Sequence, residues 1–240
     1  MRERLDEPMS LEDMAKIAYI SPFHFDRIFR QITGIPPLRF LYALRLQTAK
    51  QLLLTTDRSV TDVCFEVGYN SLGTFTTRFT QLVGLSPCRF RRLGNQFPIN
   101  PFTSSSPVDD CATVSTHSVY GHINSPSHSA QVIFVGLFET FIPQGVPIAG
   151  TLLAGPGPFQ IGPVPEGRYV AMAAAFPTSS DPIAYLLPEP QSLLVGVCRS
   201  PVTMSDGMMR GSLDITLRPL RPTDPPILIA LPYLLESRLV

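Results

Sequence analysis

Residues 23–37 read FHFDRIFRQITGIPP, and residues 73–87 read GTFTTRFTQLVGLSP. Each stretch carries two phenylalanines four positions apart, then a glycine and, three residues after it, a proline. Apolar residues at this spacing mark one buried face of an α-helix, and glycine is a common residue at a helix C-terminus. The sequence therefore predicts one helical unit that is used twice.

The residues in front of each stretch repeat as well. SLEDMAKIAYIS at 10–21 corresponds to SVTDVCFEVGYNS at 59–71, with one residue inserted before the final serine. In both, a serine precedes the first apolar residue and an aspartate follows three positions later, which is the pattern of a capped helix start. Between the units, LRFLYALRLQTAKQLLLTT at 38–56 lacks glycine and proline and predicts one long helix. Each unit is thus predicted as helix, short turn and helix, and a stiff spacer joins the two.

The second helix of each unit buries its phenylalanine stripe and leaves the opposite face free. Arginine and threonine on such a face suit a DNA major groove, where arginine reads guanine and threonine contacts phosphates or thymine methyl groups. Two such helices on one spacer can enter successive major-groove segments, about 34 Å apart. Exposed arginine and threonine also occur on helix faces that meet only water, so this pattern alone leaves both interpretations open. The candidate DNA-contacting residues are Phe23, Asp26, Arg27, Arg30, Leu72, Gly73, Thr74, Thr76, Thr77 and Arg78.

Charge and proline are distributed unevenly along the chain. Residues 1–95 hold 13 Lys/Arg and 9 Asp/Glu, a net charge of +4, whereas residues 96–240 hold 6 Arg and 10 Asp/Glu, a net charge of −4. Of the 25 prolines, 20 follow residue 95. The basic first part favours a DNA partner, and the difference in composition predicts two domains of different class.

Residues 5–93 resemble the DNA-binding domain of the AraC/XylS family of transcription regulators. The resemblance rests on SLEDMAKIAYISPFHFDRIFRQITGIPPLRF, LRLQTAKQLLL and VTDVCFEVGYNSLGTFTTRFTQLVGLSPCRFRR. It implies that the second helix of each unit is a recognition helix. Thr77 stands where the family often has a basic residue, as Arg27 does in the first unit, so we expect weaker readout by the second unit. By position, the resemblance carries base contacts over to Phe23, Asp26, Arg27, Arg30, Leu72, Gly73, Thr76 and Thr77.

The second part of the chain has a different pattern. Residues 95–117 lack helical or strand period and are rich in Ser, Thr, Pro and Asn, which is the composition of a flexible linker. Seven short β-type runs follow, separated by Gly and Pro turns, and Pro165-Glu166-Gly167 is expected to form a hairpin turn. The expected fold class is an all-α double helix-turn-helix domain at 1–94, a linker at 95–117 and an all-β antiparallel sandwich at 118–240.

The β part loosely resembles the prealbumin-like sandwich of carboxypeptidase regulatory domains. VYGHI, VPIAGTLLAGPGPFQIGPVPEGRYVAMAAA and LDITLRP carry this resemblance, which implies a structural or interaction module without catalysis. The alanines of AMAAAF either leave room for a cavity or let two sheets approach closely, and the sequence does not separate these alternatives. We expect a small effector in such a cavity to be apolar or neutral. Its candidate polar contacts are Arg168, Tyr169, Arg199 and Arg210.

The sequence offers no constellation for catalysis or metal binding. It contains neither G-x-S-x-G nor a phosphate-cradling loop, and its four cysteines lack C-x-x-C spacing. We therefore expect no enzyme activity, no metal and no cofactor, with reduced thiols in a cytoplasmic protein. Neither a signal peptide nor a membrane span is expected, because charged residues interrupt the early sequence and every apolar run is short.

Together these patterns predict a bacterial-type transcription regulator that binds double-stranded DNA at a promoter or operator. The C-terminal sandwich is expected to sense a small molecule. The alternatives are a module for homodimerisation or for contact with RNA polymerase, and a whole chain that acts as a protein-interaction adaptor without DNA readout.

Overall fold

The computed structural model describes residues 1, 4–96, 117–126, 131–141, 143–179, 181, 183–198, 200–211 and 213–230. The chain forms two compact units, one helical and one β-rich. The helical unit contains the described residues up to 96 and also two short segments from later in the chain, Phe141–Val146 and Arg221–Ala230. The rest of the described chain belongs to the β-rich unit. The expected linker lies mostly outside the described residues.

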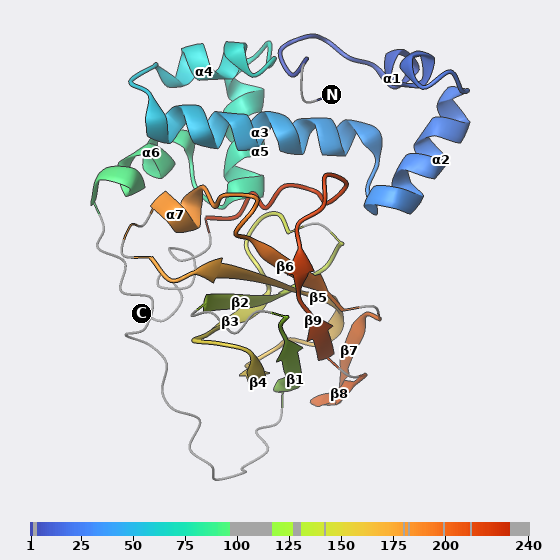
Figure 1. Ribbon diagram of the computed structural model, residues 1–240, viewed down its shortest axis with the longest axis vertical. Helices are drawn as coiled ribbons and strands as arrows, with labels where there is room; N and C mark the ends of the chain where they lie inside the picture. Colours follow the sequence, from blue (N-terminus) through green and yellow to red (C-terminus); the bar gives the residue numbers. More distant parts are fainter. Residues whose placement is uncertain are drawn as a thin grey trace. The chain divides into compact units, whose positions relative to one another are not determined.

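Six helices form between residues 11 and 96 of the helical unit, in the predicted order of two helix pairs and a long spacer. The spacer, α3, lies between the pairs, with α2 beside its first turns and α4 beside its last turns (Figure 1). The elements are α1 (Leu11–Ile17), α2 (Pro22–Thr33), α3 (Pro37–Thr55), α4 (Val60–Glu66), α5 (Leu72–Val83) and α6 (Pro87–Gln96).

The helix ends confirm the predicted repeat. Ser10 and Asp13 form a reciprocal capping box at α1, and Ser59 and Asp62 form the same box at α4. The second helix of each unit, α2 or α5, begins at a serine whose hydroxyl accepts a hydrogen bond from the backbone N–H three residues on. Both end at a glycine with left-handed backbone, Gly34 at φ 78° and Gly84 at φ 91°.

An aromatic row repeats in the two helix pairs. The rings of Phe25 and Phe29 lie 5.6 Å apart, and Phe29 meets the edge of Phe40 at 5.5 Å. In the second pair, Phe75 and Phe79 lie 5.7 Å apart, and Phe79 meets Phe90 at 5.6 Å. Edge-to-face rings at this spacing stabilise a core beyond their burial alone. The phenylalanines therefore pack inward in both units, as the spacing predicts.

The spacer helix α3 ties distant parts of the unit together. Its 19 residues give a rod of about 28 Å at 1.5 Å per residue. From the middle of this rod the buried Arg45 guanidinium donates to three backbone carbonyls: Leu5 at 2.7 Å, Glu7 at 2.8 Å and Gly68 at 2.9 Å. Because a buried charge needs such partners, Arg45 fixes the N-terminal segment and the turn of the second helix pair against the spacer.

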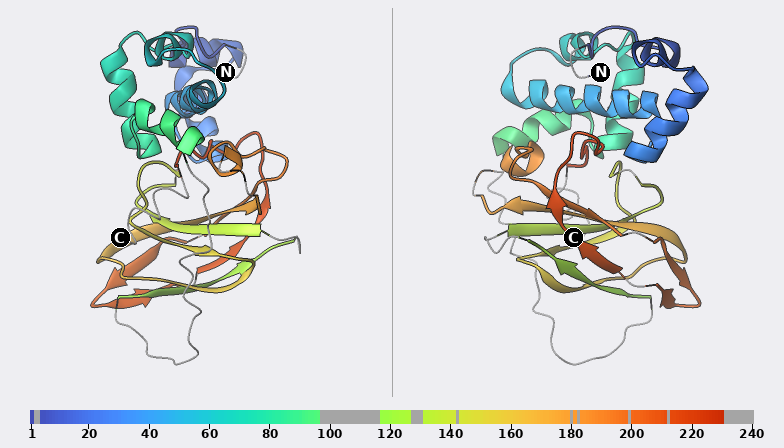
Figure 2. Two further views of the ribbon diagram at one scale, coloured as in Figure 1. Left: turned by 90° about the vertical axis from the view of Figure 1, so that its left-hand side faces the viewer. Right: turned by 45° about the vertical axis from the view of Figure 1, so that its right-hand side comes forward.

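The β-rich unit consists of two sheets that form separate layers (Figure 2). The three-stranded sheet has the order β4-β1-β9, and the larger sheet has the order β10-β6-β5-β2-β3, with the hairpin β7-β8 attached to β5. The strands are β1 (Val119–Asn124), β2 (Gln131–Phe138), β3 (Ala149–Leu153), β4 (Gly157–Ile161), β5 (Gly167–Pro177), β6 (Leu194–Val197), β7 (Val202–Ser205), β8 (Met208–Arg210), β9 (Leu213–Thr216) and β10 (Arg218–Pro219), and one short helix, α7, spans Ile183–Leu186.

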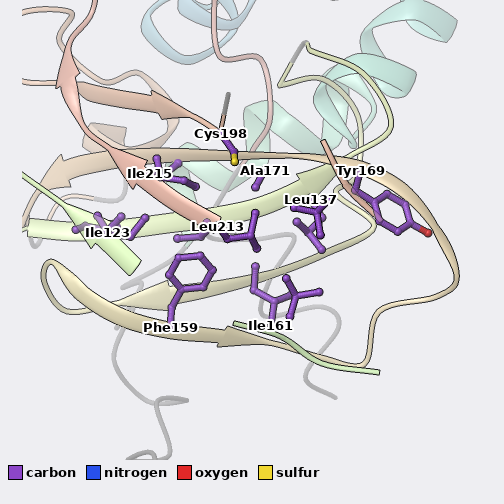
Figure 3. Packing of buried hydrophobic residues seen from close by; sticks show 14 of the residues in the cluster. Ile123, Leu137, Phe159, Ile161, Tyr169, Ala171, Cys198, Leu213 and Ile215 are labelled. Carbon is purple, nitrogen blue, oxygen red and sulfur yellow. The ribbon is translucent and has the colours of Figure 1, made fainter. Parts of the chain in front are cut away.

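Alternate residues of both sheets meet in one core. Ile123, Phe159 and Leu213 of the smaller sheet pack against Leu137 and Ala171 of the larger sheet (Figure 3). Alternation of this kind is what a sandwich requires of its inner faces. The described strands thus confirm a β-rich second part built mainly from antiparallel pairs.

Three features of the β-rich unit differ from the sequence-based expectation. The turn at 165–167 joins no hairpin, because β4 pairs with β1 whereas β5 pairs with β2 and β6 in the other sheet. The chain therefore crosses between the sheets at this turn. β1 and β9 pair in parallel. The hairpin of β7 and β8 had no strand prediction, although Asp206-Gly207 between two short apolar runs is a typical two-residue hairpin turn.

Candidate nucleic-acid interface

The exposed face of α2 carries two arginines. Phe23, Arg27 and Arg30 are exposed and lie on one side of the helix, opposite Phe25 and Phe29. The Arg30 guanidinium is paired with the Asp26 carboxylate at 2.7 Å, so much of its charge is balanced within the helix. Arg27 instead contacts the ring Nδ1 of His24 at 3.1 Å. Arg27 is therefore the candidate on this face whose positive charge has no acidic partner within 4.0 Å among the described residues.

The corresponding face of α5 is neutral and made of small residues. Leu72, Gly73, Thr74 and Thr77 are exposed at the start and middle of the helix, and Thr76 is half-buried. Small uncharged side chains allow a helix to approach bases closely and to contact thymine methyl groups. The faces of α2 and α5 are thus equivalent in position but different in chemistry.

Arg78 does not belong to the exposed face on which the sequence placed it. Its guanidinium stacks over the Tyr42 ring at 4.2 Å from the centroid, and the side chain is half-buried. Burial disfavours its charge, but a hydrogen bond with the Tyr42 hydroxyl and the nearby Tyr69 hydroxyl raise the pKa of Arg78, so the cation persists. Arg78 therefore holds α5 against the spacer, and this accounts for the lack of an exposed cation on α5.

Sequence reasoning missed two residues of these faces, Gln31 and Gln81. Both are exposed and lie one turn beyond Arg27 and Thr77, respectively. They occupy the same position in the two units, where a glutamine amide can both donate and accept hydrogen bonds. The available signal was their four-residue spacing from Arg27 and Thr77.

The residues proposed as effector contacts do not converge on one site. Tyr169 points into the sandwich core, and its hydroxyl donates to the backbone carbonyls of Pro165 at 3.2 Å and Glu166 at 3.1 Å. Arg168 and Arg210 are exposed on the opposite face, in register with Thr203 between them. Arg199 lies outside the described residues. The expected single effector site with Tyr169 as a polar contact is therefore not formed, because strand alternation sends Tyr169 and Arg168 to different faces.

Two further properties concern the described residues only. No cluster of three or more His, Cys, Asp or Glu side chains among them could hold a metal ion. None of the helices that they form combines the length and the apolar character that a membrane crossing requires.

Comparison with known proteins finds a family profile that matches the helical unit. Residues 14–93 match the profile of a helix-turn-helix domain family. The chain is 37% identical over 92 residues to the MmsAB operon regulatory protein of Pseudomonas aeruginosa, an alignment that covers 38% of this chain and 30% of the relative. It is 33% identical over 87 residues to the bifunctional transcriptional activator and DNA repair enzyme AdaA of Bacillus subtilis, covering 36% of this chain and 41% of that protein. The chain thus spans less than half the length of these relatives.

A solved structure similar to the helical unit is the DNA-binding domain of AdpA, a global transcriptional factor, in complex with a target DNA. The sequence identity is 37%, the TM-score is 0.38, and the match covers 38% of this chain and 83% of that one. The two relatives carry names of transcription regulators, and each alignment covers less than two fifths of this chain.

Proposed function

We propose that this protein is a sequence-specific regulator of transcription that binds one double-stranded DNA site, because residues 14–93 match a helix-turn-helix domain family and resemble the AraC-type DNA-binding domain. In this proposal α2 and α5 enter successive segments of the major groove. Arg27 reads a base in the first segment, and the neutral face around Thr77 contacts the second.

The observation that carries the proposal is the repeated exposed face. Arg27 and Thr77 occupy equivalent positions on α2 and α5, each opposite a phenylalanine row that holds its helix to the unit. One spacer helix about 28 Å long joins the two units, and successive major-groove segments on one face of DNA lie roughly 34 Å apart. One chain could therefore contact two groove segments of an asymmetric site.

Selection from random duplexes tests this proposal directly. We expect one enriched sequence with two conserved blocks about one helical turn apart, and an affinity whose logarithm falls linearly with the logarithm of salt concentration. Recovery of unenriched duplexes at moderate salt would contradict it and favour the adaptor alternative, in which the helical unit binds another protein.

The proposed base contact of Arg27 can be tested by substitution, with a second arginine as a matched control. Arg27→Ala should weaken binding to the selected duplex by about 1–3 kcal/mol and relax the preference for one base pair. Arg39→Ala removes the same charge from an exposed position of α3 and should leave every base preference intact. If both variants retain the wild-type base preferences, α2 does not read the site through Arg27.

For the β-rich unit we propose a sensing role, which rests on a separate observation. The exposed Arg168 and Arg210 lie in register on either side of the half-buried Thr203, in one row across three strands. Two guanidinium groups and a hydroxyl suit an anionic group of a small molecule, whereas the sequence favoured an apolar or neutral one.

A thermal-shift screen of small carboxylates and phosphates tests this role, because a ligand at 100 times its Kd stabilises a protein by about 2.7 kcal/mol. The control is the double variant Arg168→Ala/Arg210→Ala, which should lose the shift. If no compound shifts the wild type and its mass rises with concentration, the unit serves dimerisation instead.

A further inference from the structure

The C-terminal end of α5 is capped by backbone from two distant segments of the chain. The last carbonyls of an α-helix have no partner within the helix and must find one elsewhere. At α5, the Gly145 N–H donates to the Leu82 carbonyl at 2.8 Å, and the Ala230 N–H donates to the Val83 carbonyl at 3.1 Å. Both donors belong to the same compact unit as α5, although they lie more than 60 residues beyond it in sequence.

A third contact attaches the later segment to the spacer helix. The Lys50 side chain of α3 is buried, lies over the Phe90 ring at 5.6 Å and donates to the Ile227 carbonyl at 3.4 Å. A buried ammonium group needs such an acceptor. The segment Arg221–Ala230 is therefore held by two different helices of the unit, and its place there does not depend on one hydrogen bond.

The first recognition helix lacks such a cap. In the described part of the chain, no backbone N–H from another element donates to the carbonyls of Ile32 and Thr33, the residues of α2 that correspond to Leu82 and Val83. Ile32 is 61% exposed whereas Leu82 is half-buried, and Thr33 is half-buried whereas Val83 is fully buried. Among the described residues, the cap is thus found on α5 and not on α2.

Both capping segments are joined to strands of the larger sheet by short covalent connections. Phe141–Val146 lies between β2 and β3, and Arg221–Ala230 follows β10. These three strands all belong to the β10-β6-β5-β2-β3 sheet. The chain itself therefore offers a route from the ends of these strands to the two segments that cap α5.

We propose that Phe141–Val146 and Arg221–Ala230 act as a detachable cap on recognition helix α5, through which the larger sheet sets the order of that helix. When the cap is seated, the last turn of α5 is fixed. When it is released, the orphaned carbonyls fray and α5 loses its hold on its half of the DNA site. The effect on DNA rests on the proposed function, but the effect on α5 itself does not.

Gly145 offers a sharp way to disturb the cap. Its backbone is left-handed at φ 74°, and an added Cβ would lie 3.0 Å from the Gln81 carbonyl oxygen at the end of α5. Alanine there is disfavoured both by backbone conformation and by contact with the helix. Gly155 is the matched control, because it lies between β3 and β4 and an added Cβ would meet no atom within 4 Å.

Hydrogen exchange of the full chain tests the cap without DNA. In Gly145→Ala, the amides in the last turns of α5 should exchange at least about fivefold faster, the factor typical of one lost hydrogen bond, while those of α2 stay unchanged. Ala230→Pro, which removes the other donor, should produce the same local effect. Unchanged exchange of α5 in both variants, or equal acceleration in Gly155→Ala, would overturn the proposal.

The affinity for the selected duplex tests whether the cap affects DNA binding by α5. Gly145→Ala should bind several-fold more weakly than the wild type when both half-sites are intact, and equally well when the half-site of α5 is scrambled. Faster exchange of α5 with unchanged binding would overturn the role of the cap in reading. If no duplex is selected at all, DNA binding is refuted while the exchange comparison still decides whether the cap exists.

Discussion

The two helix-turn-helix units share one design but differ in how firmly they are packed. In the second unit Phe75, Phe79 and Val83 are fully buried, whereas α2 of the first unit has no buried residue and keeps Phe25 and Phe29 only half-covered. The ring geometry is nevertheless the same in both. The same helical repeat therefore does not guarantee the same stability, which depends on what surrounds each copy.

The exposed faces of α2 and α5 differ as well, and the less buried helix carries more charge on its face. The loosely packed α2 presents Arg27 and Arg30, whereas the tightly packed α5 presents threonines and turns its only arginine, Arg78, over Tyr42. Positive charge thus lies on the helix with the less buried core, and small neutral residues lie on the helix with the more buried core. If the proposed function holds, we expect α2 to supply most of the electrostatic attraction to DNA and α5 to supply a more rigid surface with weaker attraction.

The largest difference between the units should appear on truncating the aromatic rows. Phe79→Ala should destabilise the helical unit by about 3–5 kcal/mol, the range for a fully buried ring. Phe29→Ala should cost about half as much, because part of its ring already meets solvent. Urea titration followed by circular dichroism at 222 nm measures both, and equal losses would show that the units are equally packed.

Lys50 should make the stability of the second unit depend on pH. Burial lowers the pKa of Lys50 from 10.5 to about 7. Between these values the unfolded chain binds the proton and the folded chain does not, so stability should rise with pH by up to about 1.4 kcal/mol per pH unit above pH 7. Below about pH 7 the ammonium is charged in both states and this rise is absent.

The variant Lys50→Met keeps the apolar stem and removes the titrating group. Its urea midpoint should be higher than that of the wild type at pH 7, and the gap should close as the pH approaches 10. A constant gap between pH 7 and pH 10 would mean that Lys50 does not titrate in this range.

The smallest expected effects concern the turns inside the two helix pairs. Gly68 has φ 80°, and an added Cβ would lie 2.6 Å from the Leu5 carbonyl oxygen, so Gly68→Ala should cost at least about 1–2 kcal/mol. Tyr19 stands at the same place in the first unit with φ 56° and is almost fully exposed. Tyr19→Gly should change stability by less than about 1 kcal/mol, since relief of the left-handed tyrosine is offset by glycine entropy. Similar losses in both variants would remove this distinction between the units.

The repeat, the caps and the phenylalanine rows were predictable because they depend on local spacing. Serine at the helix start, glycine at its end and phenylalanine at every fourth position act within one or two turns of backbone. The position of Arg78 was not predictable, since it depends on Tyr42, which lies on another helix 36 residues earlier. On α5, Arg78 lies at the border between the buried and the exposed face of the helix. Its contact with Tyr42 places it on the buried side.

Contacts between residues far apart in the sequence account for the other features that could not be predicted. The alternation of the β runs indicated strands but did not determine that β1 pairs in parallel with β9 or that the chain changes sheets at 165–167. The assignment of Phe141–Val146 and Arg221–Ala230 to the helical unit had no sequence signal either. Their hydrogen bonds to α5 use backbone N–H groups, which every residue except proline possesses. Side-chain patterns in the sequence therefore do not predict these hydrogen bonds.

The claim that the two units read DNA unequally can be tested by one measurement, the affinity of the full chain for its selected duplex with each half-site scrambled in turn, over a range of salt concentrations. We predict that scrambling the half-site of α2 causes the larger loss and the larger fall in salt dependence, and that Arg27→Ala reproduces part of both. Equal losses from the two half-sites, with the same salt dependence, would contradict the account.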